Sequence, residues 1–210
     1  MSKSYNVESP QQKGYSHNKK SKLSVVLDLD NTIISSLSLK EIKRMKNIDK
    51  RKLDYQTMEG YYRVYSRPHL KKFLSYLFEN FDVSVWTAAS RDYASFIIEN
   101  IIMDGKKDRQ IKMFLYDNNC DESQKLYDEN SPKDLRYLYN FKGYHPCNTV
   151  IIDDLSDVFK ANPKQTIRAP YFDAKKDSSE TDDFLLDAIE KLEELKERYG
   201  NGGCAYHKHN

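Results

Sequence analysis

The chain has 210 residues, which is enough for one domain with a buried core. Its 34 Lys and Arg residues almost balance 32 Asp and Glu residues, so a basic surface over the whole molecule is excluded, although a local basic patch is not. A mean hydropathy of -0.82 and the lack of any run of ~20 apolar residues exclude a membrane-spanning helix, and we expect no membrane partner.

The N-terminal stretch is polar and almost free of aliphatic side chains, so residues 1–21 are predicted to be a disordered tail. It lacks the apolar segment of a secretory signal, and we expect an intracellular protein, nuclear or cytoplasmic, that is not secreted. The cluster Lys19, Lys20 and Lys22 is a nuclear signal, a patch that steers phosphate, or a solvated lead-in to the domain.

The first predicted element is a buried strand, LSVVLDL, at residues 23–29. Its nearly continuous apolar character is typical of a central strand in a parallel sheet. The same stretch supplies two carboxylates, Asp28 and Asp30, that are two positions apart. Their side chains share one side of the strand for as long as the strand persists.

A polar insert follows at about 38–66. Residues 38–51 are basic and polar, and we expect a short helix among them. The next segment, LDYQTMEGYYRVYSRP, predicts a β-hairpin that turns at Glu59-Gly60. Its tyrosines form a binding face or pack as ordinary sheet residues, and the neighbours Tyr61 and Tyr62 are expected on opposite sides of a strand.

Helices and strands alternate through the rest of the chain. A helix is predicted to open at Arg67-Pro68, with an apolar stripe at Leu70, Phe73, Leu74 and Leu77. Further strands are predicted at 82–87, 111–117, 148–154 and 166–172. Further helices are predicted at 91–102, 131–141 and 181–200, the last with Thr181 at its N-cap. We therefore expect one domain at 22–199, with a flexible tail at 200–210.

This alternation predicts an α/β fold with a doubly wound, central parallel sheet. Ligands of such sheets bind outside the carboxyl ends of the strands. Asp28 and Asp30 lie at that end of one strand, and Asp153 and Asp154 lie at the same end of another. Unpaired buried charges are costly, so the cluster requires a cation, and hard oxygen ligands suit Mg²⁺.

Two further residues near strand ends fit phosphate chemistry. Thr87 ends a predicted strand, where its hydroxyl and the loop amides can hold phosphate oxygens. Lys133 follows a loop before a predicted helix, where an ammonium can neutralise a phosphoryl group. Each residue alone is also typical of an ordinary turn or of solvated surface. Their order and their common position near strand ends indicate a phosphotransfer site.

The segment DLDNT, behind its apolar lead-in, resembles the DxDx(T/V) signature of the haloacid dehalogenase (HAD) superfamily of phosphotransferases. The segments RPHLKKFL, VSVWTAASRDYA, SPKDLRYL and NTVIIDDLSDVF are similar to those of one family in it, the RNA polymerase II carboxy-terminal-domain (CTD) phosphatases, also called nuclear-LIM-interactor-interacting-factor-like. The resemblance covers about residues 23–172 and includes the family's RP and YA dipeptides. It implies a HAD-like, Rossmannoid three-layer sandwich with a small β-hairpin insert and no large cap domain.

The resemblance also implies catalytic roles. Asp28 would attack phosphorus and form an aspartyl-phosphate. Asp30 would protonate the leaving oxygen and then deprotonate the water that hydrolyses the intermediate. Thr87 and Lys133 would hold and stabilise the phosphoryl group.

Mg²⁺ would be bound by the Asp28 carboxylate, the Asp30 backbone carbonyl and Asp154, with Asp153 as a supporting acid. The family motifs give further supporting positions, which are Thr32, Arg67 and Ala88. An open site without a cap suits a phosphorylated protein tail better than a small metabolite.

The leading hypothesis is a monomeric, Mg²⁺-dependent phosphatase of phosphoserine and phosphothreonine in proteins or peptides, with the RNA polymerase II tail as one candidate substrate. A HAD phosphatase of nucleic-acid ends or nucleotides is an alternative, since the basic segments 19–22 and 40–52 can bind phosphates. A non-catalytic protein-binding relative is another, although the intact carboxylate cluster argues against it.

The three cysteines, Cys120, Cys147 and Cys204, are odd in number and show no CxxC spacing. We therefore predict free thiols in a reducing compartment and no zinc site.

Overall fold

The computed structural model describes residues 22–45, 48, 52–127 and 129–205. The tail predicted at 1–21 lies outside the described residues, as do positions 46–47 and 49–51 of the basic segment. No helix in these described ranges combines the length and apolar character needed to cross a bilayer.

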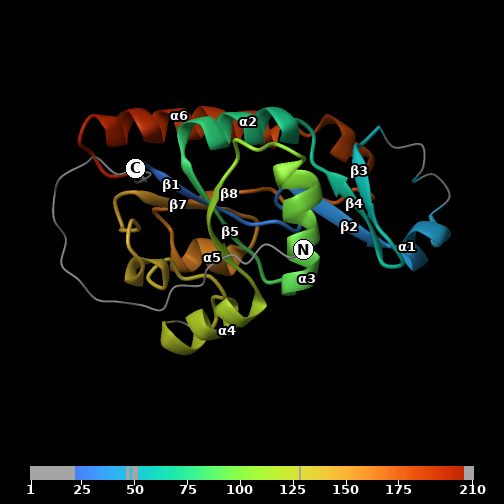
Figure 1. The fold of residues 1–210 in the computed structure, drawn as a ribbon, viewed down its shortest axis with the longest axis horizontal. Helices are drawn as coiled ribbons and strands as arrows, with labels where there is room; N and C mark the ends of the chain where they lie inside the picture. The colour runs from blue at the N-terminus through green and yellow to red at the C-terminus, as the bar shows by residue number, and fades with distance from the viewer. Residues whose placement is uncertain (1–21, 46–47, 49–51, 128, 206–210) are drawn as a thin grey trace.

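Five parallel strands form the central sheet in the order β6-β5-β1-β7-β8 (Figure 1). They are β1 (Ser24–Leu27), β5 (Asp82–Trp86), β6 (Ile111–Leu115), β7 (Thr149–Asp153) and β8 (Thr166–Arg168). The central strand β1 pairs with β5 on one side and with β7 on the other. Consequently, the residues that follow these three strands meet at one edge of the sheet, as predicted.

Helices cover both faces of the sheet, because successive β1 side chains are apolar and point to opposite faces. Val25 and Leu27 belong to the largest core cluster, and Val26 belongs to a second one. The helices of the first cluster are α2 (Leu70–Asn80), α3 (Arg91–Ile97) and α6 (Phe184–Gly200). Those of the second are α4 (Asp117–Leu126) and α5 (Ser156–Ala161). The predicted three-layer α/β sandwich is confirmed, with no large cap domain among the described residues.

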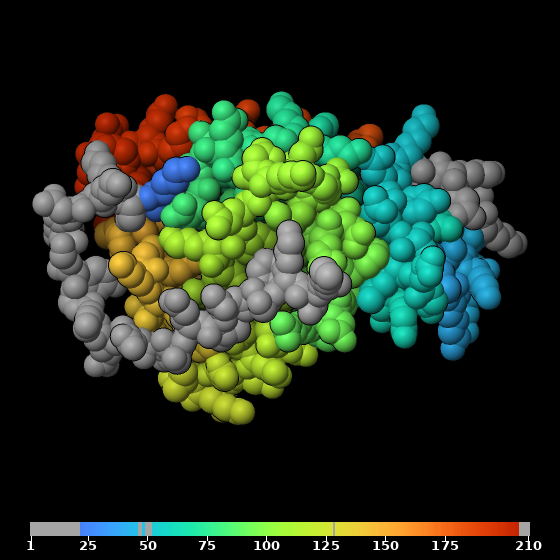
Figure 2. All heavy atoms as spheres, in the orientation of Figure 1, coloured from blue at the N-terminus to red at the C-terminus, as the bar shows by residue number. Residues whose placement is uncertain are grey.

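The insert is a small antiparallel sheet of three strands in the order β2-β4-β3. It consists of β2 (Ile34–Ser38), α1 (Leu39–Arg44), β3 (Tyr55–Met58) and β4 (Tyr62–Ser66). The predicted hairpin is confirmed, and Gly60 occupies its turn with a φ of +77°, which favours glycine. In the space-filling view of Figure 2, this lobe projects at one end of the molecule beside α3.

Several predicted boundaries are wrong for local reasons. The insert begins at Ile34 and not at about position 38, because it includes β2. This strand was not predicted, since its sequence is rich in serine. Helix α2 begins at Leu70, because Pro68 lies in a turn and His69 adopts a left-handed conformation with a φ of 66°. Thr181 does not cap α6, since it ends a short 3₁₀ helix, and Asp183 occupies the N-cap position.

Other elements also differ from the prediction. The helices α4 and α5 were not predicted, because their sequences are mostly polar. The helix expected at 131–141 is reduced to turns and the 3₁₀ segment Leu138–Asn140. Strand β8 ends at Arg168, so the remainder of the strand expected at 166–172 is an extended loop. The helix predicted at 91–102 is present, and its second half is the π-helix η2 (Ile98–Met103).

A disulfide joins Cys147 to Cys204. The prediction of free thiols is therefore wrong for these two residues and correct for Cys120, which is buried. The backbone N–H of Ala205 also donates to the Cys147 carbonyl at 2.9 Å, and Ala205 is buried. The disulfide and this hydrogen bond thus attach the first part of the expected flexible tail, up to Ala205, to the domain. The sequence did not predict this attachment, because tertiary folding brings together cysteines 57 positions apart.

Candidate active site

Asp28 lies directly beyond β1, in the centre of the sheet edge. Its side chain is only 4% exposed, and its backbone N–H donates to the Ile152 carbonyl of the neighbouring strand at 3.1 Å. The chain then turns tightly, with Asn31 at a φ of 59°, and returns Thr32 to the strand end. The Thr32 hydroxyl lies 2.7 Å from Asp28 Oδ2 and 3.2 Å from Asp154 Oδ1. Thr32 therefore links the two acidic strand ends.

Lys133 lies in the same buried cluster, as predicted. Its Nζ forms ion pairs with Asp28 Oδ1 and with Asp153 Oδ2, the latter at 2.7 Å. Burial lowers the pKa of Lys133, but the two carboxylates raise it more, so the pKa lies well above its usual range. Lys133 is therefore a fixed positive charge in contact with the nucleophile candidate.

A residue that the sequence did not single out holds the Lys133 loop in place. Asn162, at the end of α5, donates from Nδ2 to the Lys133 carbonyl at 2.8 Å. Its Oδ1 accepts from the backbone N–H of Leu135 at 2.9 Å. Asn162 thus replaces the backbone hydrogen bonds that a regular helix would have supplied here.

The acidic pair Asp153 and Asp154 ends β7, and its members differ in their surroundings. Asp153 is fully buried, with Oδ2 on Lys133 and Oδ1 accepting from the Leu155 N–H at 2.9 Å. Asp154 is half-buried and accepts from Thr32. Burial raises the pKa of both carboxyls.

Three of these carboxylates can hold a cation. Oxygens of Asp28, Asp153 and Asp154 all lie within 4.8 Å of one another. Because each carboxylate oxygen has two acceptor sites, Asp28 and Asp154 retain capacity for a hard cation beside their present partners. Within the acidic pair, Asp153 is fully buried and Asp154 is half-buried, which favours Asp154 as the metal ligand and Asp153 as its support.

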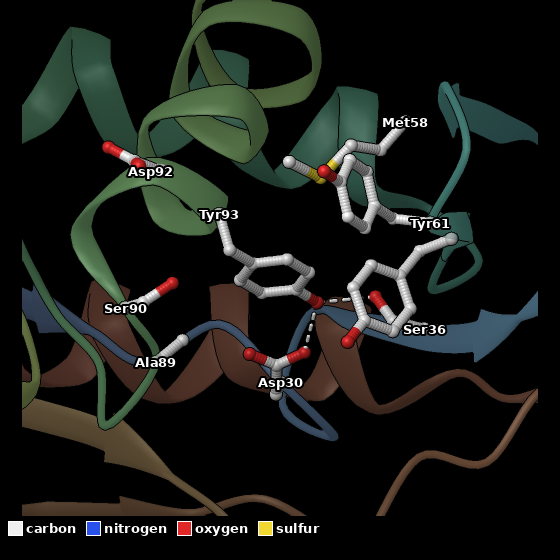
Figure 3. A pocket seen from close by; sticks show the side chains of 9 residues that line it. Asp30, Ser36, Met58, Tyr61, Ala89, Ser90, Asp92 and Tyr93 are labelled. Carbon is white, nitrogen blue, oxygen red and sulfur yellow. Dashed lines mark hydrogen bonds between the residues drawn. The ribbon is translucent and has the colours of Figure 1, made fainter.

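Asp30 lies two positions beyond Asp28, and its side chain is hydrogen-bonded to α3. The Tyr93 hydroxyl donates to Asp30 Oδ1 at 2.5 Å and also contacts the Ser36 hydroxyl (Figure 3). Burial raises the pKa of Asp30 to about 6, although the Tyr93 hydrogen bond lowers it. Neither Tyr93 nor Ser36 was predicted to have a role, and the family-like YA dipeptide at Tyr93 was the sequence signal for it.

Thr87 lies at the carboxyl end of β5, beside β1, and is buried. Its hydroxyl accepts from the backbone N–H of Ala89 at 3.1 Å, and this hydrogen bond closes the turn that follows β5. Ala88 is exposed within that turn. This geometry is that of an ordinary turn residue, which was one of the two interpretations of Thr87 from the sequence. Phosphate binding by Thr87 stays a prediction.

Arg67 is fully buried, and its guanidinium binds residues outside the Asp28, Asp153 and Asp154 cluster. Its guanidinium forms a two-bonded ion pair with Asp182, at 2.7 Å for each bond. It also donates to the carbonyls of Thr32 at 2.8 Å and Pro170 at 3.0 Å. Arg67 therefore fixes the backbone of the Thr32 turn to the C-terminal part of the domain.

A cleft of about 710 Å³ opens beside Asp30 (Figure 3). Its lining comes from the insert, from α3 and from the turn after Thr87. Tyr61 and Tyr62 both line it, with ring centroids 6.5 Å apart, whereas Tyr55 and Tyr65 pair with each other at 5.6 Å. The expectation that Tyr61 and Tyr62 oppose each other is wrong, because β4 begins at Tyr62 and Tyr61 still belongs to the turn.

The sequence is similar to the sequences of several known proteins. The family model "NLI interacting factor-like phosphatase" matches residues 23–201. The CTD phosphatase-like protein 355R of Invertebrate iridescent virus 3 is 38% identical over 186 residues, covering 85% of this chain and 99% of the relative. Protein 355R of Invertebrate iridescent virus 6 is 36% identical over 183 residues, covering 84% and 98%.

Two solved structures share the fold. Fcp1, an RNA polymerase II CTD phosphatase, matches with a TM-score of 0.53 and 22% identity, covering 87% of this chain and 54% of that one. Fission yeast Fcp1 bound to beryllium fluoride matches with a TM-score of 0.51 and 20% identity, covering 91% and 59%. This chain thus spans little more than half the length of those two chains, and the likeness establishes a HAD-like fold.

Proposed function

Since this chain belongs to the NLI interacting factor-like phosphatase family, we propose that it is a Mg²⁺-dependent phosphatase of phosphoserine and phosphothreonine in proteins. One observation carries the proposal. Asp28 is a buried carboxylate held between the Lys133 ammonium and the Thr32 hydroxyl, at the edge where the central strands end. A buried carboxylate in such a setting is oriented and electrostatically prepared to act as a nucleophile.

In the first step, an oxygen of Asp28 forms a bond to phosphorus, and the bond from phosphorus to the serine or threonine oxygen breaks. Asp30 gives its proton to that leaving oxygen. The raised pKa of Asp30 near 6, caused by burial, keeps part of the population protonated at neutral pH for this purpose.

In the second step, Asp30 takes a proton from water, whose oxygen forms a bond to phosphorus. The bond between phosphorus and Asp28 then breaks and releases inorganic phosphate. The turn that carries Asp30 is short and its side chain is held by Tyr93, so one carboxyl can serve both steps without moving far.

Charge is the main obstacle, because a phosphate dianion and Asp28 repel each other. Lys133 opposes that repulsion from a buried position. The Thr87 hydroxyl accepts from the Ala89 N–H and still has its own proton to donate to a phosphate oxygen. Asp28, Asp154 and the Asp30 carbonyl would hold Mg²⁺, which when bound supplies further positive charge at the phosphoryl group.

The substrate class follows from the site's openness and charge. The cleft beside Asp30 belongs to a small, partly exposed insert rather than to a closed cap, which admits an extended peptide. We propose phosphorylated protein tails as substrates, with the RNA polymerase II tail as one candidate. An oligonucleotide is the less favoured substrate, because two carboxylates and no cationic side chain are among the described residues that line the cleft.

The first experiment measures hydrolysis of para-nitrophenyl phosphate by the wild-type protein and by Asp28→Asn and Asp30→Asn, with Mg²⁺ and with a chelator. Asp187→Asn, on the exposed first turn of α6, is the matched control for loss of one carboxylate. The proposal requires turnover with Mg²⁺ only, loss of turnover in both site variants, and no change in the control, with melting curves showing that each variant is folded.

Phosphopeptides and 5′- or 3′-phosphorylated oligonucleotides then compete as substrates in the same assay. Preferred hydrolysis of phosphopeptides supports a protein phosphatase. Preferred hydrolysis of oligonucleotides would move the assignment to nucleic-acid ends, and a folded, metal-loaded wild type without turnover would favour a binding module.

A further inference from the structure

The cleft beside Asp30 is lined mainly by aromatic rings and carboxylates. Tyr61, Tyr62 and Met58 come from the insert, and Tyr93 and Asp92 come from α3. Asp30 lies at the inner end, where the cleft meets the catalytic edge of the sheet (Figure 3). Side chains near a bound phosphoresidue would therefore extend into this space.

The rings are arranged as a partial cage. Tyr61 and Tyr62 are stacked with centroids 6.5 Å apart, and Tyr62 meets Tyr93 edge-on at 5.6 Å. Tyr61 is 63% exposed and Tyr62 is 37% exposed, so both offer ring surface to a ligand. Electron-rich ring faces attract cations within about 6 Å of the ring centre.

The charged side chains that line the cleft are all acidic. Of the nine described residues that line the cleft, Asp30 and Asp92 are acidic and none is Lys, Arg or His. Asp92 is an exposed residue in the first turn of α3 that lines the cleft, on the opposite side of Tyr93 from Tyr61 (Figure 3). The cleft therefore complements a positive group and repels a second phosphate or an acidic side chain.

We propose that this cleft selects substrates with a Lys or Arg side chain close to the phosphorylated residue. The cation would pack on the rings of Tyr61 and Tyr62, with Asp92 contributing a negative potential. The inference rests on the proposed phosphoprotein phosphatase function and adds a sequence preference to it. A purely apolar side chain would pack on the rings but gain nothing from the negative potential of Asp92.

The test uses phosphoserine peptides in which a single Lys is scanned across the positions on either side of the phosphoserine. Each peptide has partners with Gln, Glu or Leu at the same position. The measured quantity is kcat/KM for wild type, Asp92→Asn and Tyr61→Leu. Asp187→Asn and Tyr55→Leu are matched controls, since Asp187 occupies the first turn of another helix and Tyr55 lies outside the cleft lining.

At the position that reaches the cleft, we expect Lys to be preferred over Gln by about tenfold and Glu to be the worst substrate. Asp92→Asn and Tyr61→Leu should each reduce the Lys preference to about threefold, and added salt should reduce it further. The two controls should keep the wild-type preference. Hydrolysis of para-nitrophenyl phosphate should stay within about twofold of wild type in all four variants, because that substrate carries no cation for the rings or Asp92 to attract.

Equal rates for Lys and Gln at every position would overturn the inference, and so would a preference for Leu over Lys. A Lys preference that Asp92→Asn and Tyr61→Leu leave unchanged would assign it to another surface and also overturn the inference. These outcomes leave the phosphatase function intact. Turnover of para-nitrophenyl phosphate with no hydrolysis of any phosphopeptide would instead overturn the protein-phosphatase proposal, and this inference with it.

Discussion

The catalytic edge of the central sheet and the cleft under the insert adjoin each other but are built differently. At the catalytic edge, Asp28 is 4% exposed and its oxygens contact Lys133 and Thr32. In the cleft, Tyr61 is 63% exposed and lies in a turn of a three-stranded sheet. Buried, mutually paired charges tolerate little change, whereas exposed rings can be altered without disturbing the core. Under the proposed function, the chemistry would take place at the sheet edge and the substrate would be selected in the cleft.

The largest expected effect comes from Lys133→Met, which removes the cation between two buried carboxylates. We expect a loss of activity of at least about 10³-fold and a decrease of about 3–5 kcal/mol in the free energy of unfolding. Denaturant titration and a para-nitrophenyl phosphate assay measure the two effects.

Lys160→Met is the matched control, because Lys160 pairs with Asp157 on the exposed surface of α5. Its loss should change the free energy of unfolding by less than about 1 kcal/mol. Equal destabilisation by the two substitutions would contradict the contrast between a buried and an exposed ion pair.

The next largest effect is a change in the free energy of unfolding that leaves the catalytic activity unchanged. Cys204→Ser removes the disulfide to Cys147, which closes a loop of 57 positions. Cys147 precedes the amino end of β7, whereas Asp153 lies at the carboxyl end of that strand. We expect the free energy of unfolding to fall by about 2–4 kcal/mol while kcat/KM stays within about twofold of wild type. Thermal melts of the oxidised and the reduced wild type provide the control, since reduction should reproduce the effect of the substitution. A large loss of activity in the folded variant would connect the C-terminal segment to catalysis.

A smaller effect is expected at the boundary between the two regions. Burial raises the pKa of Asp30 to about 6, and the Tyr93 hydroxyl lowers it by donating to the carboxylate. An acid must be protonated to act, so kcat/KM should fall as pH rises through this pKa. Tyr93→Phe removes the stabilisation of the charged form, so the alkaline limb should move upward by about one pH unit.

The measurement is a pH–rate profile at saturating Mg²⁺ for wild type and Tyr93→Phe. Tyr76→Phe is a suitable control, because the Tyr76 hydroxyl bonds Glu193 on α6 and not a catalytic residue. A downward shift in Tyr93→Phe, or an equal shift in both variants, would contradict the assigned role of Tyr93.

The smallest effect on activity is expected from a substitution in the insert. Tyr61→Leu should leave the turnover of para-nitrophenyl phosphate within about twofold of wild type, because the side chain is exposed and contacts no catalytic carboxylate in the recorded interactions. A loss as large as that of Lys133→Met would mean that the insert belongs to the chemistry as well, and the separation between the two regions would then fail.

The sequence by itself determined where the candidate catalytic carboxylates lie. The apolar runs that precede Asp28, Thr87 and Asp153 can only be core strands, and parallel strands bring their carboxyl ends to one edge of a sheet. The hairpin at Gly60 was likewise predictable, because turn geometry is local. The polar helices α4 and α5 were not, since neither carries a strong apolar stripe.

Only the tertiary structure decided which side chains meet. Lys133 is 105 positions from Asp28, Tyr93 is 63 from Asp30, and Cys204 is 57 from Cys147. No periodicity in one chain encodes such pairs, because hydrogen bonds and disulfides depend on positions in space that the packing of all layers sets together. The contacts of Ser36 and Asn162, and the joining of Tyr61 and Tyr62 into one cleft, follow from that packing and from no local signal. For Tyr93, the family-like YA dipeptide was a signal in the sequence, but its partner Asp30 was not predictable.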